Sequence, residues 1–133
     1  MGQNPTRTPD DQQSHDIMVR IVANDLDQKG YFVQADHIGW KNGPPNALNG
    51  HVPDVVAKTE SGKFILEIED GNTYKDQYTK EQLAAYIKDS TDICYVVVPS
   101  PITKPEVEQV LNQSGLFRVK VGIFDWNLGQ VIF

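Results

Sequence analysis

Residues 51–70 limit the possible folds of this chain more than any other segment. Apolar runs flank the turn Ser61-Gly62, and this pattern predicts a β-hairpin. Asp54 stands at the start of the first strand, and Glu67 and Glu69 stand at the end of the second. In an antiparallel pair these two places lie side by side, and carboxylates held close together raise each other's energy. Because oxygen ligands that converge from two strands suit Mg²⁺ or Mn²⁺, the hairpin predicts a metal site.

Length and composition indicate one globular domain. The chain has 133 residues, enough for one core but not for two, and we expect residues 11–133 to form that domain. Residues 1–10 have almost no apolar content and predict a disordered tail. No apolar run is long enough to span a bilayer, and the polar N-terminus is unlike a signal peptide. The single cysteine, Cys94, excludes an internal disulfide, so we expect a cytoplasmic protein without membrane attachment.

The net charge of −6 bears on any hypothesis that involves nucleic acid. Proteins that bind phosphate backbones usually carry a basic surface, because counterion release contributes to their affinity. A local basic patch can act against the average charge. The charge therefore argues against tight, unassisted DNA binding but does not exclude DNA as a partner.

Periodicity and turn residues predict alternating helices and strands around the hairpin. The expected elements are a helix over 11–29, a strand over 31–36, hairpin strands between 53 and 70, a helix over 79–90 with a capping box at Thr79 and Gln82, a strand over 93–98, a helix over 104–113, and strands over 117–124 and 130–133. The turn-rich segment 39–50 predicts a loop. Such mixed connectivity predicts an α/β sheet covered by helices on both faces.

Three short motifs follow one another on these elements. Pro53-Asp54 opens the second strand, Glu67-Ile68-Glu69 closes the third, and the segment 82–86 supplies Gln-x-x-x-Tyr on the next helix. Together they resemble the PD-(D/E)XK nuclease superfamily over roughly residues 15–100. Residues 52–57 are similar to archaeal Holliday-junction resolvases, and the Gln-x-x-x-Tyr motif is similar to that of RecB-like nucleases. The resemblance implies a restriction-endonuclease-like mixed sheet and hydrolysis of phosphodiester bonds with Mg²⁺ or Mn²⁺, with DNA as the expected substrate.

The resemblance also implies roles for individual residues. Asp54, Glu67 and the backbone carbonyl of Ile68 would hold the metal. Glu69 would orient or deprotonate the attacking water, and Gln82 would steady the arrangement from the next helix.

Two positions depart from the superfamily pattern. The lysine expected two residues after Glu67 is replaced by Glu69, although some restriction enzymes of the superfamily carry Glu at this place and still cleave. The first helix has Ile21 near the position where resolvases show a glutamate. Asp16 is then the first choice for an acidic metal ligand on this helix, and Asp25 is the second.

Other polar side chains near the motifs are candidates for substrate binding. They are His51, Lys75, Lys80 and Tyr86, with Lys41, Lys58 and Lys88 as further phosphate contacts. Many superfamily members act as dimers or receive their targeting from a partner. The expected partners are therefore double-stranded or branched DNA, a second copy of the chain, and a targeting protein.

The residues leave three functions open. The first is a metal-dependent nuclease. The second is a catalytically inactive nuclease-fold domain that binds nucleic acid or protein. Three features favour it: glutamate at position 69, the lack of a clear acidic metal ligand on the first helix, and the acidic net charge. The third is an unrelated α/β protein in which Asp54 is turn chemistry, Gln82 is only a cap, Tyr86 is a core residue and His51 is a loop residue.

Overall fold

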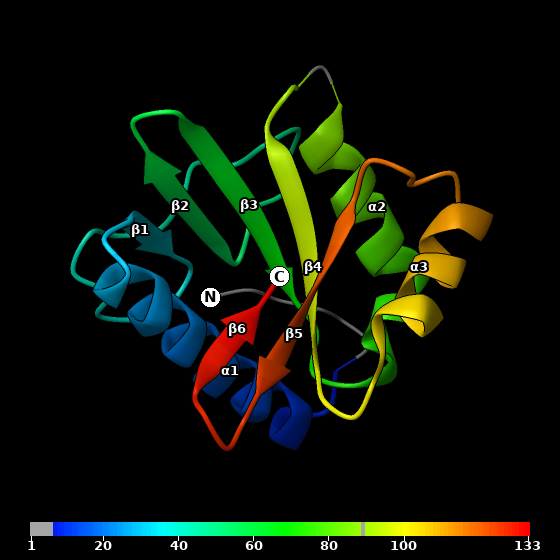
Figure 1. Ribbon diagram of the computed structural model, residues 1–133, viewed down its shortest axis with the longest axis horizontal. Coiled ribbons are helices and arrows are strands. Elements are labelled where there is room, and N and C mark those ends of the chain that lie inside the picture. The colour runs from blue at the N-terminus through cyan, green and yellow to red at the C-terminus, as the bar shows by residue number, and fades with distance from the viewer. Residues whose placement is uncertain (1–6, 89) are drawn as a thin grey trace.

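Six strands form one mixed sheet in the computed structural model, which describes residues 7–88 and 90–133, and helices cover both of its faces (Figure 1). In chain order the elements are α1 (Pro9–Gln28), β1 (Phe32–Ala35), β2 (Val55–Thr59), β3 (Gly62–Ile68), the 3₁₀ helix η1 (Asn72–Lys75), α2 (Gln77–Ile87), β4 (Ile93–Pro99), α3 (Lys104–Gln113), β5 (Lys120–Asp125) and β6 (Gln130–Ile132). The α/β class and the restriction-endonuclease-like sheet predicted from the sequence are confirmed.

The strands lie in the sheet in their sequence order, from β1 to β6. β1, β2 and β3 form an antiparallel meander, β3, β4 and β5 are parallel, and β6 returns antiparallel to β5. The parallel connections contain α2 and α3, as such connections require. In the hairpin Val55 pairs with Leu66 and Thr59 with Gly62. The start of β2 therefore lies beside the end of β3, as predicted.

Alternation along the strands divides the core into two layers. Leu66 on β3 packs with the α1 side chains, whereas Ile65 packs with Leu83 of α2 and Leu111 of α3. The buried α1 residues that meet the first face are His15, Met18, Val19, Val22, Ala23, Asp25 and Leu26, a helical spacing that produces one buried stripe. Glu67 has the same parity as Ile65, so its side chain points toward α2.

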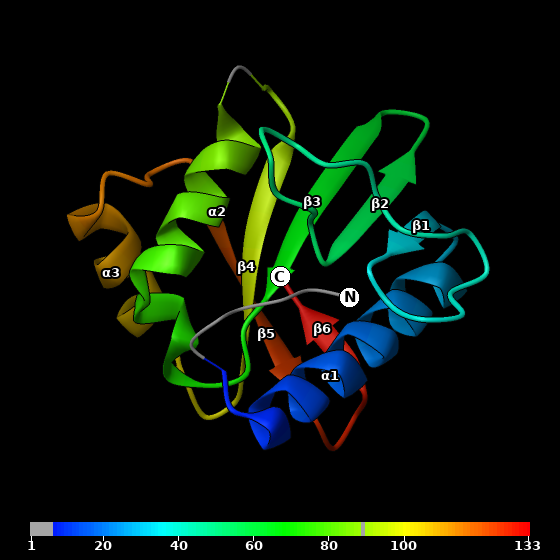
Figure 2. The same cartoon turned by 180° about the vertical axis from the view of Figure 1, so that it is seen from behind.

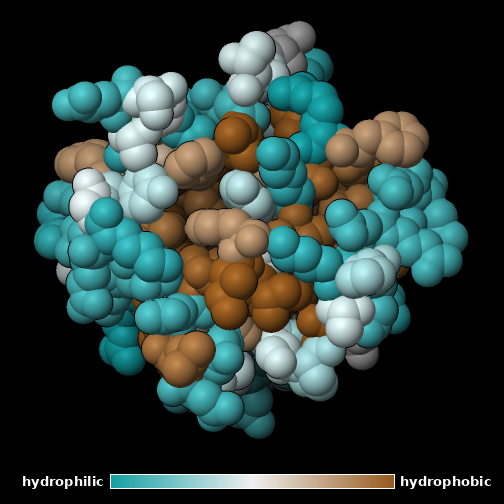
Figure 3. All heavy atoms as spheres, in the orientation of Figure 1, coloured by the Kyte–Doolittle hydropathy of each residue, from teal (hydrophilic) through white to brown (hydrophobic). Residues whose placement is uncertain are grey.

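An aromatic row crosses the face of the sheet that carries α1. The rings of Tyr31, Phe64, Tyr95 and Phe133 contact one another in turn, with centroid distances of 5.8, 6.2 and 4.3 Å. Figure 3 shows apolar residues gathered near the middle of this view, inside a hydrophilic border. A Cβ at Gly122 would lie 3.2 Å from the Phe133 ring, so glycine at this position of β5 lets the ring pack closely against the strand. The row lies on the face opposite to Glu67.

Helix α1 begins at Pro9, two residues before the predicted start. Thr8 caps it by accepting a hydrogen bond from the Asp11 N–H at 3.2 Å, and proline is favoured in the first helical turn. Part of the predicted disordered tail is therefore helical, and residues 1–6 lie outside the described part of the chain. None of the helices in the described ranges is long and apolar enough to cross a bilayer.

The predicted capping box at Thr79 and Gln82 is wrong. Helix α2 begins at Gln77 with Asp76 as its N-cap, and it ends at Ile87 rather than near Ser90. Thr79 lies inside the helix because its hydroxyl is engaged by tertiary contacts instead of capping. Strand β5 also begins later than predicted, because residues 114–119 form turns in which Val119 N–H bonds the Leu116 carbonyl. The predicted bounds of α3 are confirmed.

Candidate active site

Asp54 lies at the point where the hairpin and α1 meet. It directly precedes β2, and its Oδ2 accepts a hydrogen bond of 2.7 Å from the Ile68 N–H at the end of β3. The same oxygen lies 3.1 Å from Nε2 of His15 on α1. Asp54 is 2% exposed and His15 is fully buried. The carboxylate is therefore fixed between two strands and a helix rather than placed in a solvated turn.

Glu67 stands beside Asp54 and is held from the other side by α2. The Tyr86 hydroxyl donates to Glu67 Oε1 at 3.0 Å and lies 3.2 Å from the Val52 carbonyl. Glu67 is 2% exposed and hydrogen-bonds with the Asp54 carboxyl group. Of the predicted residues, Asp54, Glu67 and Tyr86 thus come together as one buried cluster.

The two carboxyl groups of this cluster have opposite pKa shifts. Burial, and then the charges of Asp54 and Glu69, raise the pKa of Glu67 well above its ordinary value. Burial alone would also raise the pKa of Asp54, but His15, the Ile68 N–H and Arg7 outweigh it and hold that pKa below its usual range. The two shifts therefore disfavour the state in which both carboxyl groups are ionised in the absence of a cation.

His15 supplies a cation to this pair. Burial lowers its pKa, but the charge of Asp54 and their hydrogen bond outweigh burial, so the pKa of His15 lies above its ordinary value of 6.5. Its Nδ1 lies 3.4 Å from Asp16 Oδ1. The helix thus contributes a buried histidine to the site, whereas the acids predicted from this helix were Asp16 and Asp25.

Glu69, the residue at the expected lysine position, is fully buried and surrounded by donors. Thr79 of α2 donates to Oε1 at 2.8 Å, and Thr73 of η1 donates to Oε2. Arg7 Nη2 lies 3.2 Å from Oε2, and the Arg7 side chain is only 3% exposed. Burial raises the pKa of Glu69, and Arg7 and the threonine hydroxyls oppose this effect. Glu69 therefore joins the starts of α1 and α2 to the end of β3.

Arg7 is the cation that compensates the acids at this end of β3. It forms ion pairs with Glu69 and, at 3.6 Å, with Asp70 Oδ1. Its Nη2 also lies 3.4 Å from the Ile68 carbonyl oxygen. Figure 2 shows the start of α1 close to the segment between β3 and α2. The carbonyl that was predicted to bind metal is therefore in contact with a guanidinium group.

Gln82 contributes an acceptor without a partner. Its side chain is 7% exposed and lies on the buried face of α2 with Thr79 and Tyr86. Among the described residues, its Oε1 is buried without a hydrogen-bond donor. An unpaired buried oxygen is costly, and in native structures it indicates a bound water, ion or ligand.

The remaining predicted residues lie in other surroundings. Asp16 accepts a hydrogen bond of 2.9 Å from Gln12, and Asp25 accepts from the Val131 N–H at 3.0 Å and thereby anchors β6. His51 contacts the ring of Tyr78 at 6.0 Å. Lys75 lies 5.6 Å from the centre of the Tyr74 ring, and Lys80 lines a hollow between α2 and the segment that follows α3.

Sequence reasoning missed His15 and Arg7. His15 has the spacing of the buried α1 stripe, so a polar residue on an apolar helix face was an available signal. No sequence signal indicated Arg7, because it is 62 residues away from Glu69 in the sequence.

The donor types at this site fit a hard divalent cation. Magnesium is commonly held by one or two carboxylates together with water, and Asp54, Glu67 and the Ile68 carbonyl provide such oxygens. The shared proton of the carboxyl pair is what a cation would replace. Within the described ranges, however, no group of three or more His, Cys, Asp or Glu side chains is arranged to hold a metal ion. The fit therefore rests on two carboxylates and a carbonyl.

The fold and this cluster define the chain as a protein with a restriction-endonuclease-like α/β fold. Its fold is similar to an XisH family protein from Nostoc punctiforme, with a TM-score of 0.58 and 15% identity over 89% of this chain and 98% of the other. It is also similar to AF1548, a protein of unknown function, with a TM-score of 0.54 and 12% identity over 84% of this chain. SfsA of Pyrococcus furiosus, solved in complex with Ca²⁺, gives a TM-score of 0.50 and 8% identity over 86% of this chain.

The chain spans 58% of the AF1548 structure and 57% of the SfsA structure. No protein-family model and no curated protein matches the sequence. At these identities the structural likeness shows the fold alone.

Proposed function

We propose that this protein is a metal-dependent nuclease that hydrolyses phosphodiester bonds in DNA. The observation that carries the proposal is the buried pair of Asp54 and Glu67, placed where β2 starts and β3 ends. Two carboxyl groups forced to share a proton in a buried site create a strong preference for a cation. The Ca²⁺ of the SfsA structure belongs to that protein, so the proposal depends on this pair and not on the neighbour.

Asp54, Glu67 and the Ile68 carbonyl would hold Mg²⁺ or Mn²⁺. When bound, such an ion lowers the pKa of a water and neutralises charge that develops on the phosphate. His15 and Tyr86 keep the two carboxyl groups in position through the contacts described above. The side chains thereby orient the site before substrate arrives.

The role of orienting the attacking water is assigned to Gln82. Its Oε1 has no donor among the described residues and can accept a hydrogen bond from that water. Both oxygens of Glu69 already accept from protein donors. The proposed role of Glu69 is accordingly to hold Arg7 and the start of α2, and the water-orienting role predicted for it passes to Gln82.

The partners follow from the charge of the chain. Because the net charge is −6, we propose that double-stranded or branched DNA is bound with the help of a second copy or a targeting protein. The one cysteine, Cys94, is free and buried, which suits a reducing cytoplasm.

A second candidate is a catalytically inactive domain that keeps the fold. Arg7 favours it, because its guanidinium contacts the Ile68 carbonyl, one of the proposed metal ligands, and also the neighbouring acid Glu69. In that function the side chains of Arg7 and His15 would balance the charge of the buried acids in place of a metal ion. The protein surface, and not the acidic cluster, would bind the partner.

Cleavage of plasmid, single-stranded and branched DNA with Mg²⁺ or Mn²⁺ separates the two candidates. We expect cleavage by the parent protein, and its loss in Asp54→Asn and in Glu67→Gln. Glu60→Gln is the matched control, because Glu60 is an exposed acid in the turn between β2 and β3. Calorimetric titration with Mn²⁺ should show binding to the parent and to the control only. Cleavage that survives in both site variants would refute the assigned site, and its absence in the parent would favour the second candidate.

A further inference from the structure

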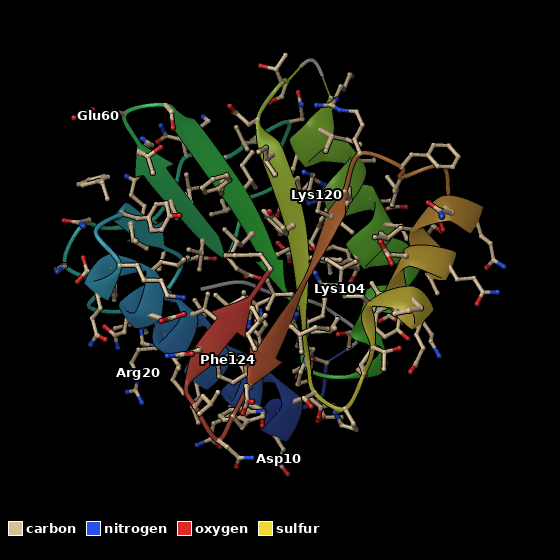
Figure 4. The ribbon with its side chains drawn as sticks, in the orientation of Figure 1. Asp10, Arg20, Glu60, Lys104, Lys120 and Phe124 are labelled. Atoms are coloured by element: carbon tan, nitrogen blue, oxygen red, sulfur yellow. The ribbon has the colours of Figure 1, made fainter. Side chains whose placement is uncertain are left out.

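A pocket with basic walls lies beside α1. Its volume is about 370 Å³, and it is lined by Arg20 and Asn24 of α1 and by residues 37–41 of the loop that follows β1. Arg20 points outward from α1 in Figure 4. The segment 39–50 was predicted only as a loop, and neither Arg20 nor His37 was singled out from the sequence.

The loop that forms this pocket is held rigidly. The Trp40 indole N–H donates to the Val33 carbonyl at 2.7 Å, and the Asn42 amide donates to the same oxygen at 2.9 Å. The backbone is closed by hydrogen bonds from Trp40 N–H to the His37 carbonyl and from Gly43 N–H to the Trp40 carbonyl. The walls are therefore preorganised, which lowers the entropic cost of binding a ligand.

The donors in the pocket suit a phosphate group. Arg20 makes no ion pair with any described residue, so its guanidinium is available for bidentate binding. Lys41 adds a second cation, although Asp27 lies 2.7 Å from its Nζ. Asn24 adds a neutral amide donor. In a chain with a net charge of −6, this is a local concentration of positive charge.

The pocket lies next to the candidate active site. The Asp36 N–H donates to the Asp54 carbonyl at 2.8 Å, and His37, the next residue, lines the pocket. On α1, Arg20 comes five residues after His15, which is about 7.5 Å along the helix axis. The loop that lines the pocket is thus joined directly to the segment that carries Asp54.

We propose that this pocket binds a backbone phosphate of the same DNA strand whose scissile phosphate lies at the acidic cluster. The proposal deepens the proposed function and rests on it for the position of the strand. Arg20 is the main phosphate ligand, and Lys41 contributes less because Asp27 neutralises part of its charge. The pocket binds the DNA strand and fixes its position, and the acidic cluster carries out the hydrolysis.

The test is DNA binding in EDTA, where no cleavage occurs. Fluorescence anisotropy of a labelled DNA duplex is measured at several salt concentrations for the parent, Arg20→Gln, Lys41→Gln and a control, Lys104→Gln. Lys104 begins α3, on the opposite face of the sheet, and its substitution removes the same charge. We expect Arg20→Gln to bind about tenfold more weakly and to lower the salt slope by about 1. Lys41→Gln should weaken binding less, and Lys104→Gln should bind as the parent does.

Trp40 reports on the pocket itself. In a Trp126→Phe background Trp40 is the remaining tryptophan, and its fluorescence should change as DNA saturates the protein. Equal binding by Arg20→Gln and Lys104→Gln, or an unchanged Trp40 signal, would overturn the proposal. An equal signal change with inorganic phosphate at the same phosphate concentration would overturn the assignment to a strand.

The two failures are distinguishable. If the parent protein does not cleave DNA but Arg20→Gln still weakens DNA binding in EDTA, the proposed nuclease activity is rejected and the phosphate pocket is retained. If the parent protein cleaves DNA but Arg20→Gln binds DNA as the parent does, the nuclease activity is retained and the phosphate pocket is rejected.

Discussion

Replacing Glu67 by glutamine is expected to stabilise the metal-free protein at neutral and alkaline pH. Glu67 is buried, and burial together with Asp54 and Glu69 raises its pKa well above 4.5. Glutamine has nearly the same shape and can accept the hydrogen bond from Tyr86. Its N–H can donate to Asp54 in the manner of a protonated carboxyl group. The substitution therefore keeps the hydrogen bonds to Tyr86 and Asp54 and removes the carboxyl group whose ionisation is unfavourable in the folded protein.

The sign of the pH dependence follows from proton binding. Between 4.5 and the raised pKa of Glu67, the folded parent protein holds a proton that the unfolded chain has lost. Its free energy of unfolding must then fall as pH rises, by up to about 1.4 kcal/mol per pH unit. Below 4.5 both states hold the proton and the effect vanishes. The free energy of unfolding of Glu67→Gln does not fall in this way. The difference in free energy of unfolding between Glu67→Gln and the parent should therefore grow as pH rises from 4.5 to the raised pKa of Glu67.

Urea unfolding in EDTA at a series of pH values measures the difference directly. A gain of 1.4 kcal/mol corresponds to a rise of roughly 3–6 °C in Tm for a domain of this size. Glu60→Gln, on the exposed turn, should follow the parent at every pH. Added Mg²⁺ should stabilise the parent and leave Glu67→Gln unchanged. A difference that is zero, or that does not vary with pH, would refute the assigned raised pKa.

Substitutions at three further residues test the contacts around the acids. His15→Gln should cost about 1–3 kcal/mol in urea unfolding. Because the net pKa shift of His15 is upward, this loss should be greatest below pH 6.5 and shrink as pH rises through the raised value. Arg7→Gln should cost about 3–5 kcal/mol, since it leaves buried Glu69 without its cation, and Arg7→Lys should recover part of the melting temperature. Tyr86→Phe should cost about 1–3 kcal/mol by removing a buried hydroxyl donor, and an unchanged urea midpoint would contradict the geometry.

The parts of the structure that depend on local sequence were predictable. The predicted turn at Ser61-Gly62 between two apolar runs specified the hairpin, although the observed turn residues are Glu60 and Ser61 and Gly62 already pairs with Thr59. The hairpin alone placed Asp54 beside the end of β3. Lys104–Gln113 was predicted with its observed bounds, because its apolar spacing and its flanking residues agree. In each case the signal lies within the segment itself, so no tertiary contact was needed to interpret it.

The parts that failed depend on contacts between distant segments. Thr79 has the sequence of a helix cap, but its hydroxyl donates a hydrogen bond to Glu69, a buried carboxylate ten residues earlier in the chain, instead. His15 meets Asp54 across 39 residues. A local pattern cannot distinguish a hydroxyl that caps its own helix from one that bonds a neighbouring element.

Glu69 illustrates why a motif position should be interpreted through its neighbours. The superfamily pattern favours a lysine there, and by sequence alone the glutamate left both an active and an inactive domain open. In the structure a cation does reach this place, but it is Arg7, which comes from the segment before α1. A lysine at 69 would face Arg7 and would remove the carboxylate acceptor that the hydroxyls of Thr73 and Thr79 share. The glutamate and the arginine thus depend on each other, and the charge of the cluster is set by both residues together.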